Sequence, residues 1–494
     1  MSDSILTRFV SGMLFTGLGK VSVTVLGIIG VMITTRNLPP AEVGVFVLII
    51  TVSLFLGEIT SLGLNFAVIK MIASREDAES KRKLINTAIY FRIFTIAVAS
   101  FIAFAAAPLL FALFNATLQP NVLIFIPVMV ALEASGKLLT AIYQGEFKFK
   151  LIGAINIVSS VINFAAIVIF VLVLRQGMLG LILAKVLSRL LAYGPAFFMA
   201  KIDLRPEFDR HLLRQMLTVG FPAQVIYMMS FVFQRADTFL IGVLLGPVQV
   251  AFYEVGRRIP DSIIDAYEAF VQVYLPFGSK LYANGEKAKL AKLLNTSLRW
   301  ISFATLCASL IVFLFGGDII SLIFSETYRS SAVVFSWLML GVTFILIDST
   351  LGYTLMAAGE AKRIPFINML MTAVSFAGYF VLIPVWGPLG AAIAMLLGIG
   401  AINPLSIYFI RRKQIAVDVS SYLKPLLIFS CFIMIIPSVS LDGFVDRIIM
   451  FAAFLTTNVL FGVIGTDDIG ILQQTMKPIV TKVKQRMTPS VEAP

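Results

Sequence analysis

The sequence predicts an all-α membrane protein that crosses the bilayer many times, and three observations indicate this fold class. Hydrophobic residues make up 59% of the 494 residues and charged residues only 13%, whereas a soluble domain has roughly 25% charged residues. The mean hydropathy is +0.95. Apolar runs of about 20 residues recur along the whole chain, and each is long enough to cross about 30 Å of hydrocarbon as a helix.

These runs define the predicted elements in order. We predict about fourteen membrane-spanning helices, near residues 10–34, 43–64, 86–113, 121–142, 151–174, 179–200, 218–245, 252–275, 297–316, 331–358, 365–384, 389–410, 422–438 and 447–465. The predicted outer loops hold only Arg36, Arg175 and Arg329, whereas the inner segments are rich in lysine and arginine. Because positive residues stay on the cytoplasmic side, we expect a multi-pass plasma-membrane protein with both termini in the cytoplasm.

The sequence lacks the motifs of several enzyme and binding classes. Cys307 and Cys431 both lie in predicted spans, so neither a disulfide framework nor a metal site is expected. The nearest match to a phosphate-binding loop, at residues 17–20, lies inside the first predicted span. The net charge of +12 is spread over many short loops, which indicates membrane topology rather than nucleic-acid binding. We therefore expect no enzyme activity, no cofactor and no nucleic-acid partner.

Four pairs of short segments recur at similar offsets in the two halves of the chain. They are 38–43 with 245–250, 83–87 with 292–296, 145–148 with 359–362, and 177–180 with 387–390. Because they fall in equivalent loops and in the same order, we predict two six-helix lobes, at residues 1–210 and 211–414. An extra helix pair at 415–466 and a cytoplasmic tail at 467–494 follow them. An even number of spans gives both lobes one orientation, so they should enclose a cavity about an axis along the membrane normal.

The eighth predicted helix carries a stripe of polar side chains on one face. Its members, at alternating steps of four and three, are Glu254, Arg258, Asp261, Asp265, Glu268 and Gln272. A charge near the bilayer centre costs roughly 2.5–3.5 kcal/mol, so we interpret the stripe as the wall of a transport cavity, with Ile263 and Ile264 facing lipid. The equivalent positions of the second helix are Val47, Thr51, Leu54, Glu58, Ser61 and Asn65. The alternative is two polar seams, each buried within one lobe.

The chain at this point resembles a known group. Two homologous six-helix lobes, the Leu-Pro-Pro-Ala-Glu-Val-Gly turn at 38–44, the Gly-Glu-x-Lys turns at 145–148 and 359–362, and the added helix pair are similar to the multidrug/oligosaccharidyl-lipid/polysaccharide exporter superfamily. The polysaccharide transporter branch is the best match, over about residues 8–465. The resemblance implies a V-shaped pair of lobes that alternates between inward- and outward-open states, with helices 1, 2, 7 and 8 lining the cleft. The implied cargo is an isoprenoid-linked oligosaccharide.

Cations within the predicted spans suit the phosphate of such a cargo, because a phosphate that crosses hydrocarbon needs charge-assisted hydrogen bonds. The candidates are Lys20, Lys137, Lys185, Arg189, Arg235, Arg257 and Arg258. Lys20, Lys185 and Arg189 have no acidic residue within one helical turn and are the stronger candidates. A structural role stays open for three of the others, through pairs of Lys137 with Glu133, Arg235 with Asp237 or a neighbouring helix, and Arg258 with Glu254.

Carboxylates and amides on the cleft-facing helices suit sugar hydroxyls. The candidates are Glu58, Asn65, Gln224, Asp261, Asp265, Glu268 and Gln272. For Gln224 the alternative is that its amide satisfies carbonyls freed by the break at Pro222. Asp348 is a lone acid within a predicted span. Two roles stay open for it: binding a proton or cation, or forming a buried hydrogen bond. The apolar last helix pair would seat an isoprenoid tail, or else form a packing or oligomer surface.

The sequence therefore predicts a flippase that moves an isoprenoid-lipid-linked oligosaccharide from the inner to the outer leaflet by alternating access. Its expected partners are that lipid-linked oligosaccharide and membrane lipids, with Na+ or H+ coupling and glycan assembly proteins as open candidates. The alternative is a cation-coupled multidrug antiporter of the same superfamily. Such an antiporter needs a pocket of acids and aromatic residues, whereas the embedded charges here include many cations.

Overall fold

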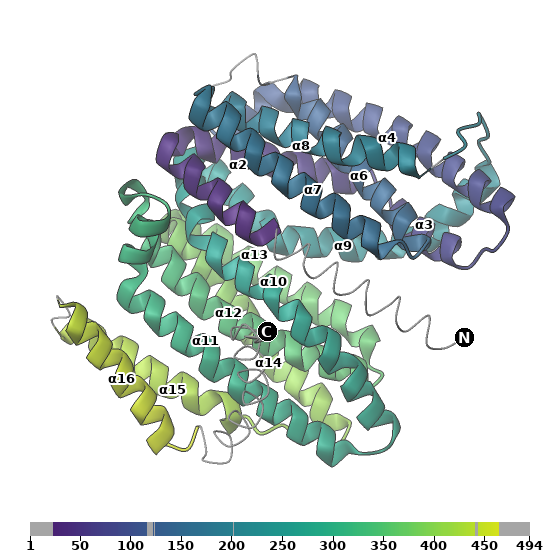
Figure 1. Ribbon diagram of the computed structural model, residues 1–494. Helices are drawn as coiled ribbons and strands as arrows, with labels where there is room; N and C mark the ends of the chain where they lie inside the picture. Colours follow the sequence, from purple (N-terminus) through teal and green to yellow (C-terminus); the bar gives the residue numbers. More distant parts are fainter. Residues whose placement is uncertain (1–22, 116–121, 123, 201, 440–442, 464–494) are drawn as a thin grey trace, which may run out of the picture.

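The computed structural model describes residues 23–115, 122, 124–200, 202–439 and 443–463. Within these residues the chain is helical and contains no β-strand (Figure 1). A first helix, Val23–Asn37, is followed by α2 (Pro40–Ile59), α3 (Leu64–Ala73), α4 (Ala78–Leu113), α6 (Phe125–Gly145), α7 (Phe149–Ile167), η1 (Val168–Val173), α8 (Gly177–Met199), α9 (Arg210–Leu245), α10 (Pro247–Ala283), α11 (Lys287–Ile323), η2 (Glu326–Tyr328), α12 (Ser331–Ala357), η3 (Ala361–Arg363), α13 (Ile364–Trp386), α14 (Pro388–Arg412), α15 (Ser420–Ile435), η4 (Ile436–Ser438) and α16 (Phe444–Leu460).

The predicted spans each coincide with one or two of these helices. In the described part of the chain, 11 helices are long and apolar enough to cross a membrane. The first helix, α10 and α16 are not among them: α10 carries the charged stripe, and the other two have only 15 and 17 described residues. The all-α, multi-pass membrane fold is therefore confirmed, and the count of fourteen stays a prediction.

The helices form two bundles that lie one above the other in Figure 1. The upper bundle holds α2, α4, α6, α7 and α8, and the lower one holds α10 to α14, with α15 and α16 packed on α11. Phe429 of α15 and Phe454 of α16 are buried against Leu306, Leu310 and Leu314. The predicted division of the chain at residue 210 remains our proposal for the lobes.

α9 connects the two bundles, because its two ends pack into different cores. Near its start, Leu212 and Met216 join the core of α3, α4 and α6. Near its end, Leu240 and Ile241 join the core of the second bundle. α9 therefore packs against one bundle near its start and against the other near its end.

The chain is broken between α2 and α3. Leu62 and Gly63 have φ values of 46° and 82°, a left-handed conformation that ends the helix and that favours glycine. The buried guanidinium of Arg92 donates from Nη1 to Thr60 Oγ1 at 3.0 Å and from Nη2 to Asn65 Oδ1 at 2.6 Å. Arg92 therefore ties together the two sides of the break.

The bundles are in close backbone contact at the predicted outer end. A Cβ on Gly44 of α2 would overlap the backbone of Pro247 at the start of α10, so only glycine allows this approach. Arg36 Nε also donates to the carbonyl of Phe324, at the end of α11, at 3.1 Å. An arginine at a helix C-terminus satisfies free carbonyls and complements the helix dipole. These contacts close the outer end.

A pH-dependent ion cluster joins two loops at the predicted inner end. Hydrogen bonds from Lys413 and Arg363 hold the pKa of Glu360 at about 2, below its usual 4.5. A lowered pKa stabilises the folded state above about pH 4.5, and this contribution is lost as the pH falls toward about 2. We expect the melting temperature of the detergent-solubilised protein to fall less between pH 6 and 3 in Glu360→Gln than in the wild type. Equal falls would contradict the assignment.

Candidate functional site

The polar stripe of α10 is directed at the first bundle. A Cβ on Gly27, in the first helix, would overlap the Arg258 guanidinium, so Arg258 reaches across to that helix. Asp265 and Glu268 lie on the same face and are exposed. The prediction that Ile263 and Ile264 face lipid is wrong, because both pack against the shared core that includes Val312, Phe335 and Leu346. The stripe therefore lies on the interlobe side of α10, as a cavity wall requires.

The equivalent stripe on α2 does not face an open space. Thr51 and Ser61 are 4% and 1% exposed, and Asn65 is bonded to Arg92. Glu58 is paired with Lys137 of α6, with Nζ and Oε2 2.5 Å apart, whereas the sequence had suggested Glu133 as the partner of Lys137. For α2, then, the alternative of a buried polar seam describes the helix better than a cavity wall.

Arg257 is held in a network of acidic side chains. Its Nη1 lies 2.8 Å from Asp237 Oδ2, and its Nε lies 2.9 Å from Asp261 Oδ2. Tyr253 donates a further hydrogen bond to Asp237 at 2.7 Å, and Arg257 Nη2 donates to the carbonyl of Gln234 at 2.8 Å. Arg257 therefore links α9 to α10, and its charge is already balanced by two carboxylates.

Arg235 and Arg189 also have acidic partners, which in both cases come from a neighbouring helix. Arg235 Nη1 lies 3.4 Å from Glu254 Oε1 of α10. Arg189 Nη2 lies 3.0 Å from Glu133 Oε1 of α6, and Nη1 donates to Tyr193 at 3.1 Å. The sequence suggested that Arg189 lacked a partner because its own helix offers none within a turn. The structure corrects this expectation through a contact that only helix packing creates.

Two of the candidate cations stay unpaired among the residues that the structure describes. Neither Lys185 of α8 nor Arg258 of α10 has an ion-pair partner there, and Arg258 Nε is buried without a hydrogen bond. Lys185 and Arg258 lie close enough to interact electrostatically, and each also has acidic neighbours beyond ion-pair distance, Glu133 for Lys185 and Glu254 and Asp261 for Arg258. Lys185 and Arg258 thus bring positive charge from both bundles to one place. Lys20 lies outside the described residues.

Gln224 is almost fully buried between the bundles, although it also lines an apolar pocket next to the α2–α3 break. Its Oε1 accepts from the backbone N–H of Gly63 at 2.8 Å, and its Nε2 donates to the carbonyl of Glu58 at 2.9 Å. A Cβ on Gly63 would overlap the backbone of Gly220, one turn before Gln224 on α9. The amide therefore hydrogen-bonds backbone groups at the α2–α3 break. The alternative proposed from the sequence was that it bonds carbonyls freed by Pro222, on its own helix. Its role in substrate binding stays a prediction.

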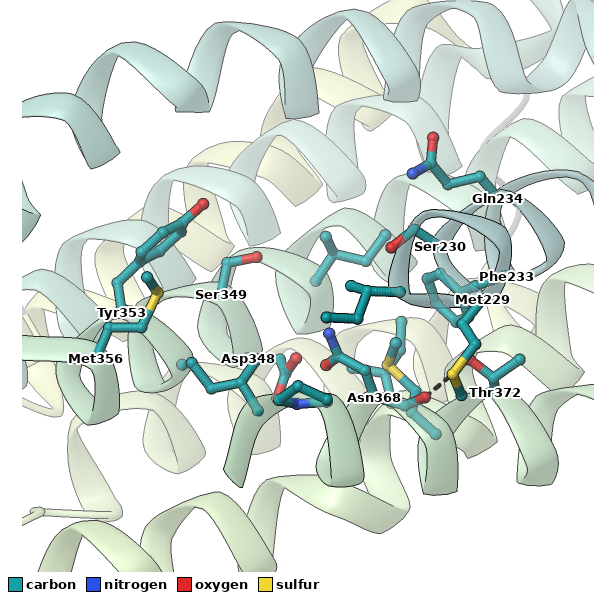
Figure 2. A pocket seen from close by; sticks show the side chains of 17 residues that line it. Met229, Ser230, Phe233, Gln234, Asp348, Ser349, Tyr353, Met356, Asn368 and Thr372 are labelled. Atoms are coloured by element: carbon teal, nitrogen blue, oxygen red, sulfur yellow. Dashed lines mark hydrogen bonds between the residues drawn. The ribbon is translucent and has the colours of Figure 1, made fainter. Parts of the chain in front are cut away.

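A pocket of about 410 Å³ lies within the second bundle (Figure 2). α9 contributes Met229, Ser230, Phe233 and Gln234 to its wall. α12 and α13 contribute the remaining labelled side chains, among them Asp348, Ser349, Tyr353, Asn368 and Thr372. Asp348 is the only charged side chain in the lining. A second, almost wholly apolar pocket of about 400 Å³ adjoins it between α9 and the α2–α3 break, and the two share Met229 and Thr372.

Comparisons with known proteins agree with this architecture. Residues 33–333 match a family model described as polysaccharide biosynthesis protein. The chain belongs to this family. An uncharacterized membrane protein in the cps region of Klebsiella pneumoniae is 23% identical over 414 residues, which cover 81% of each chain. The capsular polysaccharide biosynthesis protein CapF of Staphylococcus aureus is 29% identical over 124 residues, 25% of this chain and 31% of that protein.

Solved structures place the fold of this family member among exporters. The lipid II flippase MurJ in an inward closed conformation matches with a TM-score of 0.70 and 14% identity, over 92% of this chain and 99% of that chain. An inward-facing multidrug resistance MATE family transporter of the MOP superfamily matches with a TM-score of 0.63 and 16% identity, over 79% and 94%. The family match therefore confirms the resemblance to polysaccharide biosynthesis proteins, and the solved structures show that the fold is shared with transporters of the MOP superfamily.

Several residues of the site were missed from the sequence. Arg92 lies in an apolar stretch of α4 and was not singled out, although a lone arginine in such a stretch is a usable signal for a buried polar partner. Gln234, Ser349 and Asn368 are single polar residues on three different helices. Only packing brings them into one pocket, so no spacing along the chain marks them.

Proposed function

We propose that this protein translocates an isoprenoid-lipid-linked oligosaccharide from the inner to the outer leaflet by alternating access. The observation that carries the proposal is that Lys185 and Arg258, which come from different bundles and have no direct ion-pair partner among the described residues, lie within electrostatic range of each other. Membership of a polysaccharide biosynthesis family and the MurJ-like fold support the same class of cargo. Exporter folds also support a transport role rather than an enzymatic one.

The physical argument concerns the phosphate groups of the cargo. An unpaired cation in a membrane-embedded position is costly, on the order of 2.5–3.5 kcal/mol, and such groups persist where a ligand compensates for them. A diphosphate offers charged oxygens that accept hydrogen bonds from both an ammonium and a guanidinium. Because the two cations belong to different bundles, a bound diphosphate would favour the state in which the bundles lie together. This coupling of cargo to conformation is what alternating access requires.

The direct test is lipid flipping by the purified protein. Liposomes that contain the full-length chain should translocate undecaprenyl diphosphate carrying a fluorescent sugar, measured as the loss of signal accessible to a membrane-impermeant quencher. Protein-free liposomes and liposomes with an unrelated polytopic protein serve as controls. Flipping no faster than in these controls, with and without a Na+ or H+ gradient, would reject the proposal. A gradient-dependent rate would identify the coupling ion.

The competing function is a cation-coupled multidrug antiporter, favoured by the MATE-like fold and by the single carboxylate of the Asp348 pocket. Ethidium efflux from cells that express the protein would distinguish the two, because a flippase with a cationic site should not extrude an organic cation. We further propose contact with glycan assembly proteins in the same membrane.

The proposed orientation has both termini in the cytoplasm and the protein in the plasma membrane. On a background without Cys307 and Cys431, single cysteines at Gln176 and Ser440 should react with an impermeant maleimide added to intact cells. Cysteines at Ser80 and Glu286 should react only after the membrane is permeabilised, because the segments around them are rich in lysine and arginine. Labelling of Ser80→Cys from outside would reverse the topology.

A further inference from the structure

The pocket in Figure 2 is lined by six polar side chains that leave their hydrogen-bonding atoms open to its interior. Among the described residues, no hydrogen-bond partner is found for the side chains of six lining residues, Ser230, Gln234, Asp348, Ser349, Tyr353 and Asn368. Gln234 is exposed and the other five are partly exposed, so their polar atoms are open to the pocket rather than committed to neighbouring helices. These side chains come from α9, α12 and α13 and converge on one space, so a ligand with many hydroxyl or amide groups would satisfy them together.

The size and the apolar part of the lining fit the same ligand. The pocket volume of about 410 Å³ lies within the roughly 300–1,000 Å³ of typical small-molecule sites. A single bound cation would leave most of this volume empty, because a site for one ion is comparable in size to a site for one water molecule, about 30 Å³. Phe233, Met229 and Met356 add apolar surface, against which the C–H faces of a sugar ring can pack.

The charge of the lining separates this pocket from the phosphate site. The lining holds no cation and Asp348 is its only acid, so nothing in it would attract a diphosphate, whereas a carboxyl group hydrogen-bonds sugar hydroxyls. The two sites are nevertheless connected. The backbone carbonyl of Gln234, on the pocket wall, accepts a hydrogen bond from Arg257. Arg257 is the residue before Arg258 on α10.

We propose that this pocket is a sugar subsite, in which Asp348, Asn368 and Gln234 bind the glycan of the cargo while Lys185 and Arg258 bind its phosphates. The inference rests on the proposed function and adds to it the place where the glycan is recognised. The protein would therefore bind a glycosylated carrier lipid more tightly than the bare carrier. This difference in affinity lets it select loaded cargo over spent lipid.

The test compares binding of a sugarless and a sugar-bearing lipid to the full-length protein in nanodiscs. The probes are undecaprenyl diphosphate and the same lipid carrying glucose, galactose or N-acetylglucosamine. In the wild type, at least one sugar-bearing probe should bind about tenfold more tightly than the bare diphosphate, as expected for two or three added hydrogen bonds. Asp348→Ala and Asn368→Ala should remove this gain while the affinity for the bare diphosphate stays the same.

Three further variants sharpen the comparison. Asp348→Asn keeps a hydrogen-bond acceptor and should retain part of the gain. Lys185→Gln should weaken all probes equally, because it acts on the phosphates. Ser430→Ala is the matched control: it removes a hydroxyl that bonds to Leu426 within α15, remote from the pocket, and should leave every affinity as in the wild type.

The outcomes separate the two proposals. The sugar subsite is overturned if no sugar improves binding to the wild type, or if the gain survives in Asp348→Ala and Asn368→Ala. It is also overturned if Asp348→Asn keeps the full gain but removes a dependence of binding on Na+ or pH, which would make the pocket a cation site. Failure of the wild type to bind undecaprenyl diphosphate at all would instead count against the proposed function.

Discussion

Replacing Lys185 or Arg258 by Glu is expected to reduce the flipping of a lipid-linked oligosaccharide by about a hundredfold or more. Each cation is unpaired within the described residues and lies near the other across the two bundles. A charge-assisted hydrogen bond to phosphate contributes roughly 1.5–3 kcal/mol, so its loss costs tenfold to hundredfold, and a carboxylate adds repulsion. The measurement is the initial flipping rate in liposomes, normalised to the amount of reconstituted protein.

Conservative variants distinguish an anion site from a structural role. Lys185→Arg and Arg258→Lys should retain most activity, and Lys185→Gln should lie between the wild type and Lys185→Glu. Lys289→Glu is the matched control, because Lys289 is 70% exposed in the first turn of α11, on the predicted inner side. Near-normal flipping by both Glu variants would place the phosphate site elsewhere.

Adding a methyl group at Gly63 or Gly220 is expected to open the contact between α3 and α9 and to abolish transport. A Cβ at either position overlaps the backbone of the other residue, and the hydrogen bonds from Gln224 to this region depend on the same approach. At Gly63 an alanine must also adopt a φ of 82°, which costs about 1–2 kcal/mol. The expected result is a loss of flipping together with a longer distance between spin labels at Glu79 and Lys289, on opposite bundles.

Two other glycines isolate the cause of this effect. Gly285 has a similar φ of 76° with nothing within 4 Å of its Cβ position, and Gly400 lies in a helix with the same open space. Gly285→Ala therefore carries the backbone strain of Gly63→Ala without the overlap, and Gly400→Ala is the helical counterpart of Gly220→Ala. If all four variants flip lipid at one rate and give one label distance, the α3–α9 contact is not part of the transport cycle.

The sequence alone predicts the class of this protein because membrane insertion depends on local composition. A run of about 20 apolar residues is enough to place one helix in the membrane, and the positive charge of the flanking loops sets its orientation. The all-α membrane fold can therefore be predicted without knowledge of any tertiary contact. The stripe on α10 is equally local: its spacing follows from helical geometry, and the structure directs that face toward the first bundle, as Arg258 shows by reaching Gly27.

Which charges are free, by contrast, depends on helix packing. Arg189, Lys137 and Arg235 each form an ion pair with a carboxylate on another helix. The spacing of residues along one helix cannot predict a partner on another helix. The backbone N–H of Gly63 and the side-chain amide of Gln224, which form a hydrogen bond, lie 161 residues apart in the sequence. The polar pocket joins side chains from α9, α12 and α13. The sequence thus determined a many-spanning transporter with cations inside its helices, whereas only the tertiary structure decided which cations remain unpaired, because pairing requires two helices to approach within hydrogen-bond distance.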